Sequence, residues 1–174
     1  MRRRLRSPHG SLLLVLAADI AYIPFRKGVF YLIAIQDWYS RKILSWRLSP
    51  TLDLSFCLGA LRVALATYGS PQLFNTDQGS HFTASRWVDM LKAHGVTISM
   101  DGKGRTIDDV FIERFWRSLK YEYVFLHPVE DGVELKAGLK TYITWYNQSR
   151  PHSALDDLTP DAVYAGGSMS NCAS

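Results

Sequence analysis

Three acidic residues, Asp19, Asp77 and Glu113, have the type and the setting of carboxylates that act on a phosphodiester. Asp19 and Asp77 each follow an apolar run, and Glu113 lies in a helical pattern, with 35 residues between Asp77 and Glu113. Carboxylates brought together repel one another, and divalent cations relieve that repulsion while they polarise a phosphate. We therefore interpret these acids as metal ligands for phosphoryl transfer on DNA.

The same residues also fit an ordinary protein surface. Asp77 stands in the sequence TDQGS, and aspartate shortly before glycine commonly serves turn chemistry. Glu113 is followed by Arg117 and Lys120, a spacing that usually forms a solvated helix face with weak ion pairs. Spacing alone leaves both interpretations open.

Glu113 belongs to a helix predicted for residues 107–125, which has one polar and one apolar face. With the apolar face on a sheet, Glu113 would bind metal while Arg117 and Lys120 hold neighbouring phosphates. The polar face carries Asp109, Glu113, Arg117 and Lys120, and the apolar face carries Ile107, Phe111, Phe115 and Leu119.

The rest of the chain predicts a mixed α/β layer fold whose helices cover a sheet. The first strand should end near Asp19 or Tyr22, because a ligand at a strand end is rigidly held and faces solvent. A first helix should begin at a cap, Thr51 or Asp53, and end at Gly69. Strands are predicted at 12–24, 30–38, 42–48, 72–76 and 96–100, and further helices at 84–93, 107–125, 133–147 and 161–164.

Composition restricts the class of protein. The chain has 174 residues, 47% of them hydrophobic and 21% charged, as in an ordinary globular domain. A net charge of +4 and a pI near 9.1 are compatible with a polyanionic partner without requiring one. The two cysteines and five histidines show no disulfide or zinc spacing, and no apolar run is long enough to span a membrane. We expect a cytoplasmic protein. The first residues are basic and are followed by a short apolar run, which is also a feature of signal peptides.

Several motifs together resemble the integrase catalytic core of bacterial insertion-sequence transposases, in the DDE superfamily that includes retroviral integrases. The similarity runs from about Ala17 to Tyr164, and five motifs in the same order with the 35-residue spacing make it specific. The motifs are DIAYIPF, AIQDWYSRKILSW, FNTDQGSHFT, DDVFIERFWRSLK, and WYNQSRPHSAL with TPDAVY.

This resemblance implies a ribonuclease-H-like fold, a five-stranded mixed sheet of order 3-2-1-4-5 flanked by helices. It implies two Mg²⁺ or Mn²⁺ ions held by Asp19, Asp77 and Glu113, water-driven cleavage at the element ends, and in-line attack of the freed 3′-hydroxyl on target DNA. Lys120 matches a basic position that is expected to contact element-end DNA. The implied partners are element ends, a target duplex and further copies of the chain on DNA, with no membrane.

Two departures from the family pattern bear on activity. The family usually has threonine where Ala21 stands and asparagine where Asp109 stands, and an added carboxylate near the metal site would change metal affinity or DNA approach. The first 14 residues do not match, and no helix-turn-helix region for reading element ends precedes the core. The alternative function is therefore an inactive DNA-binding or oligomerising remnant of a transposase, N-terminally truncated.

The domain boundaries follow from these observations. We expect a basic arm at 1–14, the catalytic core at 15–165, and a disordered tail at 166–174. The loop before the Glu113 helix carries Lys103 and Arg105, which either touch phosphates or belong to a plain connector. The tail motif around Tyr146 and Arg150 is open to two roles, packing or DNA contact. A third reading of the acids, a nuclease acting on RNA–DNA hybrids, shares the same chemistry.

Overall fold

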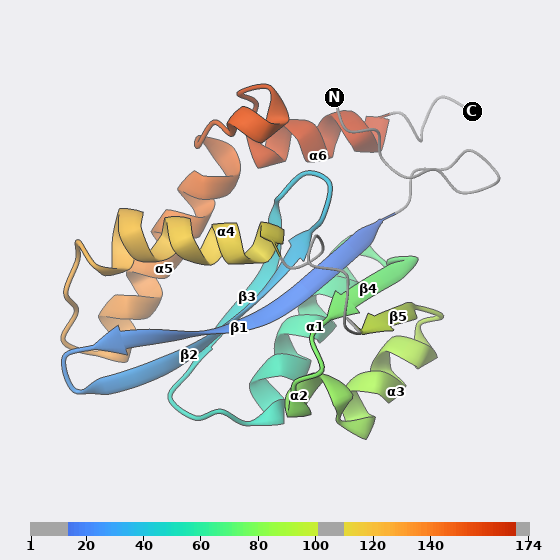
Figure 1. Ribbon diagram of the computed structural model, residues 1–174, viewed down its shortest axis with the longest axis horizontal. Helices are drawn as coiled ribbons and strands as arrows, with labels where there is room; N and C mark the ends of the chain where they lie inside the picture. Colours follow the sequence, from blue (N-terminus) through green and yellow to red (C-terminus); the bar gives the residue numbers. More distant parts are fainter. Residues whose placement is uncertain (1–13, 101–109, 170–174) are drawn as a thin grey trace.

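The computed structural model describes residues 14–100 and 110–169 of this chain (Figure 1). Its strands are β1 (Val15–Phe25), β2 (Gly28–Asp37), β3 (Ile43–Ser49), β4 (Leu73–Thr76) and β5 (Thr97–Met100). Its helices are α1 (Leu54–Tyr68), α2 (Ser80–Thr83), α3 (Ser85–Ala93), α4 (Val110–Leu119), α5 (Gly132–Gln148) and α6 (Pro160–Met169). Outside the described residues lie most of the expected basic arm, Lys103, Arg105, Asp109 and the last five residues.

The strands form one mixed sheet of order β3-β2-β1-β4-β5, which confirms the predicted order. β1, β2 and β3 follow one another in the chain and form an antiparallel meander. β4 lies parallel to β1, and β5 lies parallel to β4. The parallel neighbours require crossovers, which α1 and the α2–α3 segment supply.

β1 lies almost within the predicted range of 12–24 but runs past Asp19, and this changes the setting of Asp19. The strand was expected to end near Asp19 or Tyr22, but it continues to Phe25 and pairs with β2 along its length. β4 accompanies β1 only through Ala17, which pairs with Asn75. Beyond that point β1 pairs with β2 alone, β2 stays paired with β3 as far as Tyr31, and only the ends of β1 and β2 near their turn form a two-stranded ribbon (Figure 1). Asp19 therefore lies inside a strand, just past the point where its parallel neighbour ends.

Helix α1 begins at Asp53, the second of the two predicted caps. The Asp53 carboxylate accepts hydrogen bonds from the amides of Ser55 at 2.8 Å and Phe56 at 3.3 Å, two donors that the helix itself leaves unpaired. The helix ends at Gly69, whose φ of 82° is a conformation that glycine adopts without strain. Thr51 instead donates its hydroxyl to Asp53 and so holds the cap in place.

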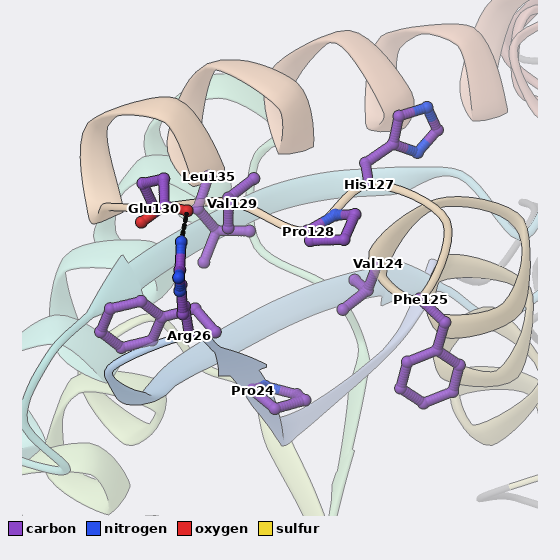
Figure 2. Close-up of a pocket in the computed structure, with 10 residues that line it drawn as sticks. Pro24, Arg26, Val124, Phe125, His127, Pro128, Val129, Glu130 and Leu135 are labelled. Atoms are coloured by element: carbon purple, nitrogen blue, oxygen red, sulfur yellow. Dashed lines mark hydrogen bonds and ion pairs between the residues drawn. The ribbon is translucent and has the colours of Figure 1, made fainter.

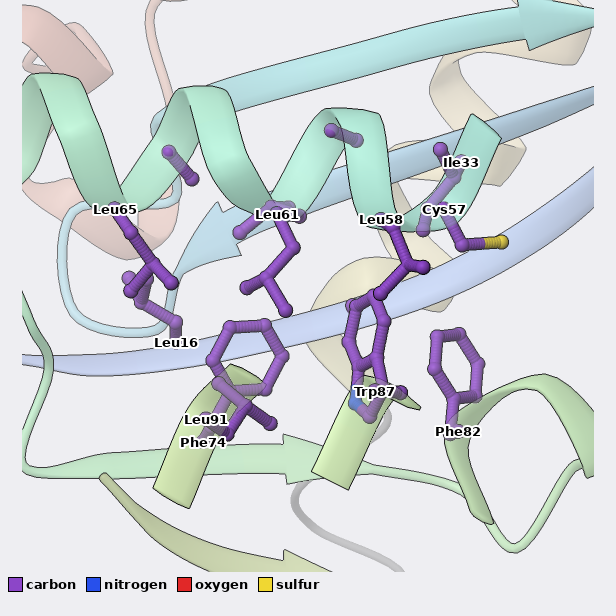
Figure 3. Close-up of a cluster of buried hydrophobic side chains, with 14 of the residues drawn as sticks. Leu16, Ile33, Cys57, Leu58, Leu61, Leu65, Phe74, Phe82, Trp87 and Leu91 are labelled. Atoms are coloured by element: carbon purple, nitrogen blue, oxygen red, sulfur yellow. The ribbon is translucent and has the colours of Figure 1, made fainter. Parts of the chain in front are cut away.

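One hydrophobic core fills the space between the sheet and helices α1 and α3 (Figure 3). Trp87 of α3 lies at its centre with no exposed surface and meets the rings of Phe74 and Phe82 edge-on, with centroids 5.8 and 5.1 Å away. Phe74 belongs to β4, and Phe82 belongs to α2. Trp87 therefore packs against both segments that flank Asp77 in the sequence.

A second core lies on the opposite face of the sheet, under α4 and α5. As predicted, the apolar stripe of the Glu113 helix is buried, through Phe111, Phe115 and Leu119. α5 adds Leu135, Leu139 and Tyr146 to the same layer. The sheet is thus covered on both faces, which explains the continuous apolar sequence of β2.

The Glu113 helix is not a uniform α-helix to residue 125, as the sequence predicted. It is α-helical from Val110 to Leu119 and continues as a π-helical turn, η1 (Lys120–Val124). Glu122, Tyr123 and Val124 are three consecutive residues that all pack inward, and a wider turn accommodates them. The periodic pattern did not reveal this, because the partners that draw these residues inward come from α5 and the segment after it.

Glu122 is the centre of a polar network that joins this turn to the C-terminal segment. It accepts two hydrogen bonds from Arg150, from Nε at 2.9 Å and from Nη2 at 2.5 Å, and a third from the Tyr142 hydroxyl at 2.8 Å. The Arg150 bonds are the main reason that the pKa of Glu122 lies below its ordinary value. A bidentate, partly buried pair of this kind is among the stronger side-chain contacts.

Replacing Arg150 with methionine should destabilise the fold by about 1–3 kcal/mol at neutral pH, because Glu122 keeps its charge and loses its main donor. The lowered pKa means that the contact contributes fully above the ordinary glutamate pKa and is lost as pH falls through the folded-state value. The difference between variant and wild type should therefore shrink in acid. Urea unfolding at several pH values measures it.

Arg26→Met is the matched control for this measurement. Arg26 pairs with Glu130 at 2.6 Å, but the two side chains are 72% and 59% exposed, and such pairs contribute less than about 1 kcal/mol. Equal losses in the two variants, or a loss in Arg150→Met that persists unchanged at low pH, would contradict the role given to the Glu122 pair.

The C-terminal segment is fastened to the edge of the sheet. The Asn147 side chain accepts from the Ile43 amide and donates to the Ile43 carbonyl, both at 2.9 Å, and so occupies part of the free edge of β3. α6 extends from Pro160 to Met169, well beyond the short helix predicted at 161–164 and into the expected tail.

None of the helices in the described residues combines the length and the hydrophobicity of a membrane span.

Candidate active site

The structure sets Asp77 next to Asp19. In the parallel pair of β1 and β4, Ala17 stands opposite Asn75, and two further residues along each chain are Asp19 and Asp77. Neighbouring strands lie about 4.8 Å apart, and residues two apart point to the same face. Asp77 comes directly after β4, as predicted, and its charge acts on Asp19.

Helix α4 brings the third acid to this face. The indole Nε1 of Trp116 donates a 2.8 Å hydrogen bond to Oδ2 of Asp19. Glu113 is three residues before Trp116, so the two residues share one side of the helix. Glu113 is itself exposed, which leaves its carboxylate accessible to a ligand.

Asp19 is the most strongly held of the three carboxylates. Besides Trp116, the amide of Ile20 donates to Oδ1 at 2.7 Å. Burial raises the pKa of Asp19, these two hydrogen bonds lower it, and the charges of Asp77 and Glu113 raise it further. Asp77 and Glu113 are thus close enough for their charges to act on Asp19.

Asp77 is positioned by the turn that follows it. Its Oδ1 accepts a 2.8 Å hydrogen bond from the amide of Gly79, which is the turn chemistry that its sequence suggested. A Cβ on residue 79 would lie only 2.8 Å from the same oxygen, so a larger residue there would displace the Asp77 carboxylate. The turn and ligand interpretations of Asp77 are therefore compatible.

The donor set suits a hard divalent cation. Carboxylate oxygens are the ligands that Mg²⁺ and Mn²⁺ prefer, and three carboxylates supply the negative charge that such ions balance. Two more oxygens beside Asp77, Oδ1 of Asn75 and Oγ1 of Thr76, are buried with no hydrogen-bond partner within the described ranges. Within those ranges, however, no three acid, histidine or cysteine side chains already form a coordinating group.

The predicted DNA-contact residues fall into two groups. Arg117 is exposed on α4 and Lys120 is half-buried at its end, one and two turns from Glu113 along the same helix. Lys103, Arg105 and the added acid Asp109 lie outside the described residues. Ala21 is buried in the core under α4.

A surface pocket elsewhere on the molecule is distinct from this site (Figure 2). It lies between the turn of the β1–β2 ribbon and the loop that precedes α5, and Arg26 and Glu130 form an ion pair across it. Phe125 lines one end. None of the three acids lines this pocket.

The sequence itself places this site in a family. A model of the integrase core domain matches residues 14–106, and a second model with the same description matches residues 94–160. This chain belongs to the integrase core domain family. The family covers the sheet, the Asp77 turn and the Glu113 helix alike.

Relatives of this integrase core are transposases of insertion sequences. The transposase of IS904 from Lactococcus lactis is 34% identical over 145 residues, which are 82% of this chain and 57% of the relative. Transposase InsF of IS3A from Escherichia coli is 30% identical over 148 residues, 83% of this chain and 51% of the relative. The chain thus spans about half the length of these relatives.

Solved integrase structures share the fold. The catalytic core of BIV integrase superposes with a TM-score of 0.71 at 17% identity, covering 90% of this chain and 97% of that one. The HTLV-2 integrase catalytic core, solved in complex with magnesium in a dimeric form, gives 0.68 at 18% identity, covering 88% and 98%. The ribonuclease-H-like fold expected from the sequence motifs is confirmed.

Two features of the site were missed from the sequence. Trp116 is 7% exposed and packs in the core under α4, and its indole N–H also donates to Asp19. The sequence signal that could have indicated this contact is the position of Trp116, three residues after Glu113 on the same side of the helix. The tail motif was left open, and its described contacts are structural: Tyr146 packs edge-on against Phe115 and His152, and burial lowers the pKa of His152 to about 4.

Proposed function

We propose that this integrase core cleaves DNA at the ends of an insertion element and joins those ends to target DNA, using divalent metal ions. The observation that supports the proposal is the hydrogen bond from Trp116, on the helix of Glu113, to Asp19 on β1, whose parallel neighbour β4 ends directly before Asp77. The charges of Asp77 and Glu113 both act on Asp19.

In this proposal Asp19, Asp77 and Glu113 would hold two Mg²⁺ or Mn²⁺ ions. Such ions supply charge that polarises the scissile phosphate and activates the attacking oxygen. The protein's own part is to hold the carboxylates in place, through Trp116 on Asp19 and the Gly79 amide on Asp77. Water is the attacking oxygen in cleavage, and the freed 3′-hydroxyl is the attacking oxygen in joining.

The cations near the acids have a separate role. We assign Arg117 and Lys120 to the phosphates beside the scissile bond, because both follow Glu113 on the same helix. The loop residues Lys103 and Arg105 are assigned to phosphates farther along the DNA. The implied partners are element ends, a target duplex and other copies of this chain, in the bacterial cytoplasm and at the nucleoid.

The test is a strand-transfer assay with the full 174-residue chain. Labelled duplexes made from the DNA that borders its gene are incubated with Mn²⁺ or Mg²⁺, and shortened and joined products are separated on a gel. Both products should form with metal and disappear with a chelator. A chain that binds the duplex and forms neither product would instead be the inactive remnant, and preferential cutting of RNA–DNA hybrids would favour a ribonuclease.

Trp116→Phe should lower metal-dependent strand transfer about 10–100-fold while the fold is retained. Phenylalanine keeps a smaller aromatic ring in the core, but Asp19 loses its 2.8 Å hydrogen bond and a preferred orientation, and such supporting contacts typically carry effects of this size. Because Trp116 acts through Asp19, the Mn²⁺ concentration that gives half-maximal activity should rise as well.

Trp87→Phe is the matched control, since the Nε1 of Trp87 is buried without a hydrogen-bond partner among the residues that the structure describes. Both variants remove one indole from a core, and only one removes a bond to a candidate ligand. If Trp116→Phe keeps wild-type activity and metal dependence, Trp116 is a packing residue alone.

A further inference from the structure

A stripe of exposed cationic and aromatic side chains runs along α4 and η1, starting next to Glu113. Its members are Arg114, Arg117, Tyr121 and Phe125, spaced by three, four and four residues, so they share one side of the helix. All four side chains are exposed, and the two aromatic rings are 66% and 54% exposed. Such a stripe presents charge near the acids and aromatic surface farther away.

The π-helical turn explains why the two aromatic residues face solvent. Glu122, Tyr123 and Val124 are drawn inward together, Glu122 by Arg150 and Val124 by the core. The residues on either side, Tyr121 and Phe125, are therefore left on the outer surface. The exposure of the two rings is thus built into the irregular turn, and π-helical turns are frequent at functional sites.

The two rings form an ordered pair. The Tyr121 and Phe125 rings are perpendicular, with centroids 5.4 Å apart. In an edge-to-face pair, one ring uses its edge and leaves broad ring surface free for another contact. Phe125 also lines the pocket next to the β1–β2 turn, where Figure 2 shows its side chain at one end.

The charges along this helix favour a polyanion over a protein or lipid tail. Arg114 and Arg117 lie between the acids and the aromatic pair. The acid nearest to the pair in sequence, Glu122, is engaged by Arg150 and points away from the stripe. Cations next to exposed aromatic rings are the surface that single-stranded nucleic acid recognises, since bases stack on the rings while cations hold phosphates.

The dimensions also fit a strand that leaves the active site. Glu113 and Phe125 are 12 residues apart. At about 1.5 Å per helical residue this is about 18 Å, which corresponds to about five nucleotides at 3.4 Å each. A strand that passes the acids therefore reaches the aromatic pair after about five nucleotides.

We propose that Tyr121 and Phe125 form a stacking platform for unpaired bases of the DNA strand that enters or leaves the active site. This inference rests on the proposed function, because the DNA must lie along α4. It adds a preference for DNA whose ends are opened or single-stranded, with Arg114 and Arg117 holding the phosphates between the acids and the platform.

The test compares two DNA probes by fluorescence anisotropy, a blunt duplex and the same duplex with a single-stranded overhang that carries 2-aminopurine. Wild type should bind the overhang probe about tenfold more tightly and quench its fluorescence, since stacking on one aromatic ring changes affinity by about 5- to 150-fold per base. Tyr121→Ala with Phe125→Ala should remove both effects and keep blunt-duplex affinity. Tyr121→Phe should keep both, because it keeps the ring.

Val133→Ala is the control, since Val133 is 79% exposed on α5 and lies off the stripe. Unchanged overhang preference in the double alanine variant would overturn the platform, and so would equal binding of both probes by wild type. If the double variant instead loses self-association alone, the pair is a protein interface. A wild type that joins DNA without overhang preference refutes only the platform, whereas one that binds no DNA refutes the proposed function as well.

Discussion

Glu113→Gln should abolish strand transfer, by about 10³-fold or more, and leave the fold intact. Glu113 is exposed on α4, so an isosteric amide should change the free energy of unfolding by less than about 0.5 kcal/mol. The lost activity corresponds to about 4 kcal/mol of transition-state stabilisation. The physical reason is charge: glutamine offers a neutral oxygen where the proposed site needs a negative one to hold a divalent ion.

A direct binding measurement separates this effect from a catalytic one. Mn²⁺ should raise the melting temperature of wild type, because a ligand that binds only the folded state stabilises it, and should raise that of Glu113→Gln less. Asp89→Asn is the matched control, an exposed carboxylate on α3. Full activity in Glu113→Gln, or an equal loss in both variants, would remove Glu113 from the proposed metal site.

Trp87→Ala should cost about 3–5 kcal/mol of stability, the range for removing a fully buried large aromatic side chain. For a domain of this size the melting temperature should fall by about 10 °C. The substitution opens a cavity between Phe74 of β4 and Phe82 of α2, whose rings flank the Asp77 turn in sequence (Figure 3). Strand transfer should therefore fall even at temperatures where the variant stays folded.

Trp145→Ala tests whether burial is the reason. Trp145 is 44% exposed on α5 and contacts the ring of Tyr142, so its loss should cost about 1 kcal/mol or less. Calorimetric melting of the two variants compares them directly. Similar losses at both positions would mean that the core around Trp87 does not have the role in stability that its packing indicates.

The positions of most strands and helices could be predicted from local sequence patterns. The apolar run of β2, the Asp53 cap, the Gly69 end and the buried face of α4 all depend on residues within a few positions of one another. Such signals survive in one sequence because the same short-range sterics and hydrogen bonds act wherever the segment lies. The candidate acids Asp77 and Glu113 were found by the same route, and their role as metal ligands remains a prediction.

The features that the sequence did not show depend on distant partners. Asp19 lies within a strand because β1 pairs with β2 beyond the point where β4 ends. The wide turn at Lys120–Val124 accompanies the bonds from Arg150 to Glu122, 28 residues apart. The hydrophobic periodicity of β1 and of the Glu113 helix does not indicate these long-range contacts.

The sequence by itself indicated most of the strands and helices, the buried face of α4 and three candidate acids, and the resemblance of its motifs to the integrase core implied the order of the strands. Only the tertiary structure decided that Trp116 holds Asp19, across 97 residues of chain, and that Tyr121 and Phe125 face solvent as a pair. The reason is physical. Local propensity depends on neighbours in the chain. Which residues become hydrogen-bond partners, and which helix face stays exposed, depends on how distant elements pack against one another.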